Sequence, residues 1–202
     1  MHPTYARALD DAARTFASLD ALAPAVEHAA QVIGDALLAG GKLLVCGNGG
    51  SAADAADFAT EFACRFVGER RPYPALNLGA CGSLLTATAN DYGADEIFAR
   101  PVRAFGKAGD VLVAITTSGN SANVLAALAA ARDVGLATIA LLGRDGGAAR
   151  GRAQVELIVP GNATARIQEA HQFLLHAICE LIEPRLANAA PAATKGQAGT
   201  VA

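Results

Sequence analysis

Residues 45–62, VCGNGGSAADAADFATEF, carry the change of pattern that decides the fold. An apolar segment runs into the turn GNGGS at 47–51, and the turn runs into a segment with helical spacing. A strand, a glycine turn and a helix in this order leave backbone N–H groups and the positive end of the helix free to bind an anion. Asp54, Asp57 and Glu61 then follow at spacings of three and four, which places three carboxylates on one helix face.

The alternation of apolar strands and helices continues along the chain. The pattern predicts strands at 42–46, within 70–78, at 109–116, 137–143 and 155–160, and helices at 4–18, 23–39, 82–90, 122–134 and 164–186, with a helix over 91–106 broken near Pro101. Continuously apolar strands between helices indicate a parallel sheet that is covered on both faces. The predicted fold class is therefore α/β, a doubly wound parallel sheet flanked by helices with an N-terminal helical extension.

The chain of 202 residues is long enough for one domain with a sizeable core. Residues 1–40 are expected to form two helices of that same domain and to pack subunits together, and residues 41–187 to form its main part. The low-complexity tail at 188–202 is expected to be disordered.

Composition argues against several classes of protein. The net charge of −3 gives no electrostatic footprint for nucleic acid. No apolar run reaches the roughly 20 residues that span a bilayer, and the polar N-terminus does not resemble a signal peptide. The four cysteines contain no CxxC pair, which favours reduced thiols over a zinc finger. A cytoplasmic protein without nucleic-acid or membrane partners is expected.

A second polar turn, TTSGNS at 116–121, also follows a strand and precedes a helix. Thr116, Thr117, Ser118 and Ser121 add hydroxyl donors there. Neither turn matches GxxxxGK[ST] or GxGxxG, and neither supplies a lysine, which fits a phosphate monoester better than a triphosphate. The alternative is that glycine and serine merely form tight turns and helix caps.

The C-terminal helix offers groups that could complement the acids. Gln168 and His176 lie eight residues apart, near one helix face. With Asp57 and Glu61 they would make a mixed oxygen and nitrogen metal site, or Glu61 and His176 a general acid/base pair. A core histidine is the alternative, and spacing alone does not bring the two helices together. Asp54 is interpreted as a first-turn acid favoured by the helix dipole.

Six motifs, CGNGGSAADA, ANDYG, FARPV, GDVLVAITTSGNSANVL, GRDGG and TARIQEAH, together resemble the sugar isomerase (SIS) fold and, within it, the phosphoheptose isomerases. The resemblance covers roughly residues 5–187. It implies a cytoplasmic aldose–ketose isomerase that interconverts sedoheptulose 7-phosphate and glycero-manno-heptose 7-phosphate and feeds heptose into lipopolysaccharide or other surface and nucleotide-linked sugars. It further implies a homotetramer with active sites at subunit interfaces and a bound zinc ion.

The resemblance also assigns roles to individual residues. It makes Glu61 and His176 catalytic, and Asp57, Glu61, Gln168 and His176 metal ligands. The implied substrate contacts are Asn48, Gly49, Gly50, Glu61, Asn90, Asp91, Thr116, Thr117, Ser118, Ser121 and Gln168. Asp57 departs from the family, which has histidine there. Aspartate can bind zinc through oxygen, but it adds a negative charge and has a shorter reach.

The implied chemistry is proton transfer through an enediol. Glu61 would move a proton between neighbouring carbons while His176 acts on the oxygens, with the phosphate in the turn at 116–121. Two other readings are a non-catalytic SIS regulator that binds the replication initiator, and an isomerase or sensor for another sugar phosphate.

Overall fold

Five parallel strands form the centre of the domain in the computed structural model, which describes residues 1–189. The strands are β1 (Leu43–Gly47), β2 (Ala75–Asn77), β3 (Val111–Thr116), β4 (Ala137–Gly143) and β5 (Val155–Val159). Their order across the sheet is β2-β1-β3-β4-β5. Every neighbouring pair is parallel, as the continuously apolar strands predicted.

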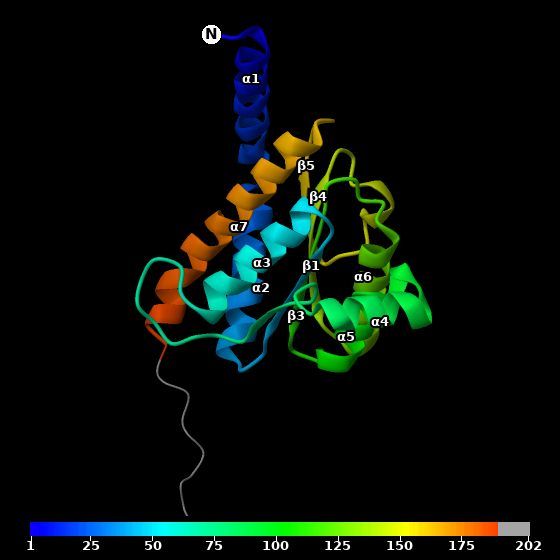
Figure 1. Cartoon of the computed structure of the whole chain (residues 1–202). Coiled ribbons are helices and arrows are strands. Elements are labelled where there is room, and N and C mark those ends of the chain that lie inside the picture. The colour runs from blue at the N-terminus through cyan, green and yellow to red at the C-terminus, as the bar shows by residue number, and fades with distance from the viewer. Residues whose placement is uncertain (190–202) are drawn as a thin grey trace, which may run out of the picture.

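Helices cover both faces of this sheet (Figure 1). They are α1 (Pro3–Ala17), α2 (Ala23–Leu38), α3 (Gly50–Ala63), α4 (Gly82–Tyr92), α5 (Ala99–Phe105), α6 (Ala122–Val134) and α7 (Thr164–Ala187), with short 3₁₀ turns η1 (Ser18–Leu22), η2 (Ala94–Glu96) and η3 (Gly147–Ala149). One face carries α2, α3 and α7, and the other carries α4, α5 and α6. The predicted α/β class is confirmed.

The sequence of β3 explains why helices are needed on both sides. Val113 and Ile115 belong to the apolar cluster beneath α2, α3 and α7, whereas Leu112 and Ala114 belong to the cluster beneath α5 and α6. Successive side chains of a strand point to opposite faces, so a strand that is apolar throughout must be covered twice.

The strand order creates a crevice between β1 and β3. From β1 the chain crosses to β2 on one side, and later returns to β3 on the other side. The loops after β1 and β3 therefore leave the sheet in opposite directions, and ligands of open α/β sheets bind at such a point. Both polar turns predicted from the sequence lie at these two strand ends.

The helix break near Pro101 and the C-terminal tail are two local predictions that the structure does not confirm. The break predicted near Pro101 is wrong, because the helical segment already ends at Gly93, whose φ is +92°. Pro101 lies in the first turn of α5, where its missing N–H leaves no intrahelical bond unmade. The tail predicted for 188–202 lies outside the described residues from 190 onward.

The N-terminal helices differ from each other in burial. α2 contributes Ile33 and Leu37 to the core cluster that α7 shares, whereas α1 contains no buried residue. Figure 1 shows α1 projecting beyond the rest of the domain. Among residues 1–189, no helix combines the length and the apolar character that crossing a membrane requires.

A buried histidine joins α7 to the sheet. His171 is fully buried, and its Nε2 lies 3.0 Å from the carbonyl oxygen of Leu142 in β4. Burial lowers the pKa of His171 from 6.5 to about 4, although the Leu142 carbonyl acts in the opposite direction. The neutral ring donates its Nε2–H to that carbonyl.

We expect this histidine to make folding sensitive to acid. The unfolded chain takes up a proton near pH 6.5, whereas the folded chain resists it until about pH 4. The free energy of unfolding should therefore fall below pH 6.5, by about 2 kcal/mol between pH 6.5 and 5. Urea unfolding at several pH values measures this loss. The His171→Gln variant keeps a hydrogen-bond donor but cannot titrate, so its free energy of unfolding should fall by that much less over the same pH range. Parallel stability profiles for the two proteins would contradict the prediction.

Candidate active site

The two polar turns face each other across the crevice between β1 and β3. The side chains of Asn48, after β1, and Asn123, in the first turn of α6, exchange two hydrogen bonds of 2.9 and 3.0 Å. Gly49 has a φ of +55° and directly precedes α3. The amide pair therefore connects the turn before α3 to the first turn of α6.

The turn at 116–121 gathers hydroxyl groups. Thr116 Oγ1 lies 3.1 Å from Ser121 Oγ and 3.4 Å from Ser118 Oγ, and Thr117 lies between them in the chain. Gly119 makes the turn possible, since its φ is +66° and a Cβ there would lie 2.0 Å from the carbonyl oxygen of Gly146. Several hydroxyls beside the start of α6 suit a bound oxyanion.

The acids of α3 meet the histidine of α7, which sequence spacing could not establish. Asp57, Glu61 and His176 each offer one atom, and these three atoms lie within 4.8 Å of one another. His176 Nε2 is 3.2 Å from Asp57 Oδ2. All three side chains are half-buried, so they remain open to a ligand.

This group of three has the chemistry of a divalent-cation site. Two carboxylates and one imidazole supply oxygen and nitrogen donors, which zinc and several other divalent metals accept. Three protein ligands leave a coordination position for water or substrate, as catalytic zinc sites do. The residues present therefore fit a metal ion, even with aspartate at position 57.

A buried arginine holds the end of α3 in place. Arg70 donates from Nη2 to the carbonyl of Glu61 and from Nη1 to the carbonyl of Phe62, at 2.5 and 3.1 Å. Its Nε donates to Glu183 of α7 at 2.9 Å, and only 1% of its side chain is exposed. Arg70 was not predicted from the sequence to belong to the site. Nothing in its spacing marks it as the link between α3 and α7.

The surroundings of Glu61 raise the pKa of its carboxyl group. Burial is the main cause and the charge of Asp57 adds to it, while His176 and Arg70 act in the opposite direction. A carboxylate that holds a proton more tightly than usual is better suited to take one from carbon.

Gln168 extends from α7 toward the start of α3, at one end of a groove between these two helices. A Cβ on Gly50 would lie 2.3 Å from Gln168 Oε1, so a side chain there would displace this amide. A hollow of about 470 Å³ extends along the two helices, lined by Asp54, Ala165, Gln168, Glu169 and Gln172.

Asp54 has a different place from the one predicted. The first turn of α3 contains no acid, so the interpretation of Asp54 as a first-turn residue is wrong. Asp54 is 6% exposed, and its Oδ2 is buried without a hydrogen-bond partner. Burial raises the pKa of its carboxyl group, and the Gln168 amide partly opposes this.

Asn90 and Asp91 stand apart from the other candidates. They end α4, on the opposite face of the sheet from α3 and α7, and Asn90 Nδ2 donates to Asp91 Oδ1 at 2.7 Å. Within residues 1–189 no hydrogen bond connects either residue to the acids or the histidine.

Conversely, Gln172 was not predicted to belong to the site, yet its amide donates a hydrogen bond to Asp57.

Comparison with known proteins decides the family. Residues 5–143 match the SIS domain model. The phosphoheptose isomerase of Citrifermentans bemidjiense is 55% identical over 165 residues, which cover 82% of this chain and 86% of the relative. The chain belongs to the phosphoheptose isomerase family.

Solved structures agree with this membership. The phosphoheptose isomerase of Neisseria gonorrhoeae superposes with a TM-score of 0.84 at 43% identity. That of Francisella tularensis superposes with a TM-score of 0.87 at 37% identity. Each comparison covers 90% of this chain and 97% of the other. The expected SIS fold is confirmed.

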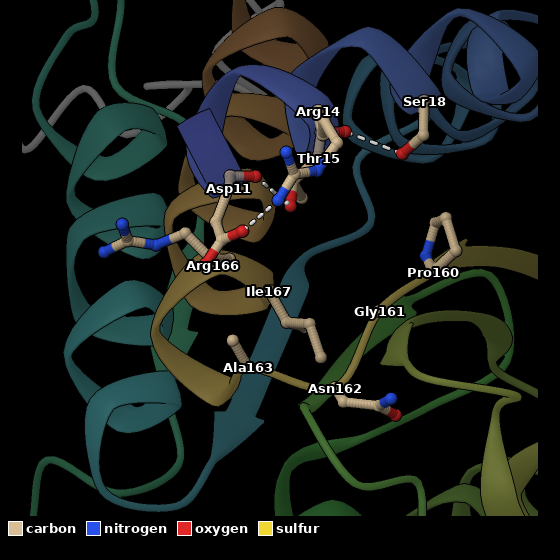
Figure 2. A pocket seen from close by; sticks show the side chains of 10 residues that line it. All are labelled: Asp11, Arg14, Thr15, Ser18, Pro160, Gly161, Asn162, Ala163, Arg166 and Ile167. Atoms are coloured by element: carbon tan, nitrogen blue, oxygen red, sulfur yellow. Dashed lines mark hydrogen bonds and ion pairs between the residues drawn. The ribbon is translucent and has the colours of Figure 1, made fainter. Parts of the chain in front are cut away.

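A further cavity, of about 410 Å³, lies between α1 and the start of α7 in this family member (Figure 2). Figure 2 shows the Arg14 guanidinium beside Asp11, with which it forms an ion pair. Arg166 pairs with Glu169 and donates to the carbonyl of Ala8. The lining contains no candidate residue, and the charges of both arginines are already paired.

We expect the Arg70–Glu183 pair to control the stability of the site. Arg70→Met removes the donors to the C-terminal end of α3 and leaves the Glu183 carboxylate unpaired, which should cost about 3–5 kcal/mol in the free energy of unfolding. Urea denaturation measures this loss. The double variant Arg70→Met/Glu183→Gln removes the unpaired charge and should recover part of it. Equal losses in the single and double variants would show that the charge is not responsible.

Proposed function

We propose that this chain is an aldose–ketose isomerase that converts D-sedoheptulose 7-phosphate to D-glycero-D-manno-heptose 7-phosphate through an enediol. The observation that carries the proposal is the meeting of Glu61 and His176 in one half-buried group between α3 and α7. A base and an acid within reach of one substrate are what the transfer of a proton between neighbouring carbons requires. No electrons leave the sugar, so the reaction needs no redox cofactor.

The roles proposed for the residues come from the family resemblance, and the meeting of Glu61 and His176 supports them. The phosphate binds in the hydroxyl turn at 116–121, with Asn48, Gly49 and Gly50 on the facing turn and Gln168, Asn90 and Asp91 as further contacts. Glu61 takes a proton from the carbon beside the carbonyl and returns it to the neighbouring carbon. His176 donates and accepts protons at the two oxygens. The raised pKa of Glu61 supports its role as the base.

A divalent metal, zinc by resemblance, belongs to this proposal. Asp57, Glu61 and His176 would hold it, and the resemblance adds Gln168 as a fourth ligand. When bound, it would polarise the carbonyl and hydroxyl oxygens of the sugar.

The names of the relatives favour this activity over its rivals. Proteins 48–55% identical over most of their length are named phosphoheptose isomerases. A regulator that binds the replication initiator would have no need of Glu61 and His176 together. We also propose that the protein acts in the cytoplasm, where it supplies heptose for lipopolysaccharide or other surface and nucleotide-linked sugars.

We expect Glu61→Gln to abolish most turnover while sugar-phosphate binding persists. Loss of a general base lowers the rate about 10²- to 10⁴-fold. Aldose formation from sedoheptulose 7-phosphate measures turnover, and calorimetry measures binding, both at equal metal content. Glu69→Gln, which changes an exposed glutamate nearby, is the control and should behave as the unmodified protein. Near-normal turnover in Glu61→Gln would remove this residue from the mechanism.

The proposal includes a homotetramer with active sites at subunit interfaces. Glu61 lies eleven residues beyond Gly50, roughly 16 Å along α3 at about 1.5 Å per residue. A sugar phosphate that contacts both the glycine turn and Glu61 of one subunit would have to span this length. A second subunit that brings its own turn or acids would shorten the distance. Tyr5, Leu9 and Phe16 on α1 are 61%, 53% and 39% exposed and offer apolar surface for such packing.

Leu9→Glu should therefore weaken both assembly and activity. A charge in the middle of the exposed apolar side of α1 must be desolvated when subunits pack, which opposes association. Sedimentation velocity measures assembly, and turnover at the same protein concentrations measures activity. A stable monomer that keeps full activity on dilution would contradict the shared site.

A further inference from the structure

The GRDGG motif at 143–147 begins at the end of β4 and lies beside the hydroxyl turn, because β3 and β4 are neighbouring parallel strands. None of its residues is among the proposed substrate contacts. A Cβ on Gly143 would overlap the carbonyl oxygen of Thr117, and a Cβ on Gly147 would lie 2.6 Å from the carbonyl oxygen of Ser118. The backbones of the two turns are therefore in direct contact, with no side chain between them.

Asn120 is at the centre of the hydrogen bonds that join the same two segments. Its Nδ2 donates to the Ser118 carbonyl at 3.0 Å, and its Oδ1 accepts from the N–H of Ala148 in η3 at 3.0 Å. The N–H of Ala149 donates to the Gly119 carbonyl at 2.9 Å. One amide side chain thus connects Ser118 with the 3₁₀ turn that contains the last glycine of the motif.

The residues of the hydroxyl turn therefore divide into two groups. Four of them offer hydroxyls to the proposed phosphate, whereas Gly119 and Asn120 contact the rest of the protein. The backbone N–H of Asn120 also donates to Ser118 Oγ at 3.2 Å, so the position of that hydroxyl depends on the conformation of Asn120. Donors that are already held in place bind an anion more tightly than donors that must first be ordered.

We propose that Asn120 is a positioning residue for phosphate binding, which holds the hydroxyl turn against the GRDGG motif and thereby fixes the donors that the phosphate meets. The inference rests on the proposed function, which places the phosphate of the sugar in this turn. Asn120 acts through Ser118 and does not itself touch the substrate. Because Glu61 and His176 come from α3 and α7, loss of the Asn120 amide affects binding and leaves proton transfer intact.

Two asparagine variants of the full-length protein test this role. Asn120→Ala should raise the KM for sedoheptulose 7-phosphate about 10-fold, the effect of losing one or two hydrogen bonds, with kcat nearly unchanged. Binding of inorganic phosphate, followed by the ³¹P line width in NMR spectra, should weaken by a similar factor. Asn188→Ala is the matched control, since Asn188 also donates its amide to a backbone carbonyl, that of Pro184 at 2.8 Å, but at the far end of α7. It should leave the KM and phosphate binding unchanged.

Two glycine variants provide an independent test with one and the same substitution. Gly147 and Gly151 have φ values of +53° and +77°, so alanine is strained at both positions. A Cβ at 147 would lie 2.6 Å from the Ser118 carbonyl oxygen and 2.8 Å from Asn120 Oδ1, whereas a Cβ at 151 would meet nothing within 4 Å. Gly147→Ala should therefore raise the KM and weaken phosphate binding, and Gly151→Ala should lower only the free energy of unfolding.

Circular dichroism establishes that the four variants fold. Equal KM values in the two asparagine variants, a fall in kcat as large as the rise in KM, or equal phosphate binding in the two glycine variants would each overturn the proposal. An unmodified protein that does not bind phosphate would also overturn it. Lack of isomerase turnover with the differences in phosphate binding intact would instead count against the proposed function.

Discussion

The contact between Arg70 and Glu183 is the interaction on which the arrangement of the candidate site depends. α3 carries Asp57 and Glu61, α7 carries His176, and the two helices belong to segments far apart in the chain. Arg70 is buried, and it binds the last carbonyls of α3 and a carboxylate of α7 at the same time. A planar guanidinium with several fixed donors is suited to join three acceptors in one place. Because both helices also pack on the sheet, this link fixes the site relative to the whole domain.

The sheet topology separates two kinds of chemistry that would otherwise interfere. The turns at 47–51 and 116–121 lie at the carboxyl ends of β1 and β3, where backbone N–H groups and hydroxyls favour an anion. The acids lie farther along α3, and the groove lined by Asp54 and Gln168 lies between. An anion can therefore be bound without direct repulsion from Asp57 and Glu61. This resolves the apparent conflict between a turn that suits an anion and an acidic helix that begins at the same turn.

Aspartate at position 57 changes the electrostatics of the site relative to a histidine. It places a second carboxylate beside Glu61, raises the pKa of that residue and receives the amide of Gln172. The neighbouring groups thus compensate for the added charge through hydrogen bonds, with or without a cation. The same chain keeps a second histidine, His171, neutral and buried only five residues from His176, because it faces the sheet instead of the groove. Position on the helix, and not residue type, separates the structural histidine from the one in the candidate site.

The sequence by itself determined the fold class, the five strands, the two polar turns and the family. These follow from local patterns: strands that are apolar throughout must be covered on both faces, and glycine turns after such strands must lie at one edge of a parallel sheet. It also placed Asp57, Glu61 and His176 on the correct faces of their helices. Only the tertiary structure decided that these faces meet, that Asp54 is buried beside Gln168, and that Arg70 and Gln172 belong to the site. Such contacts join residues more than a hundred positions apart, and helical spacing fixes a direction around one axis but not which other helix lies there.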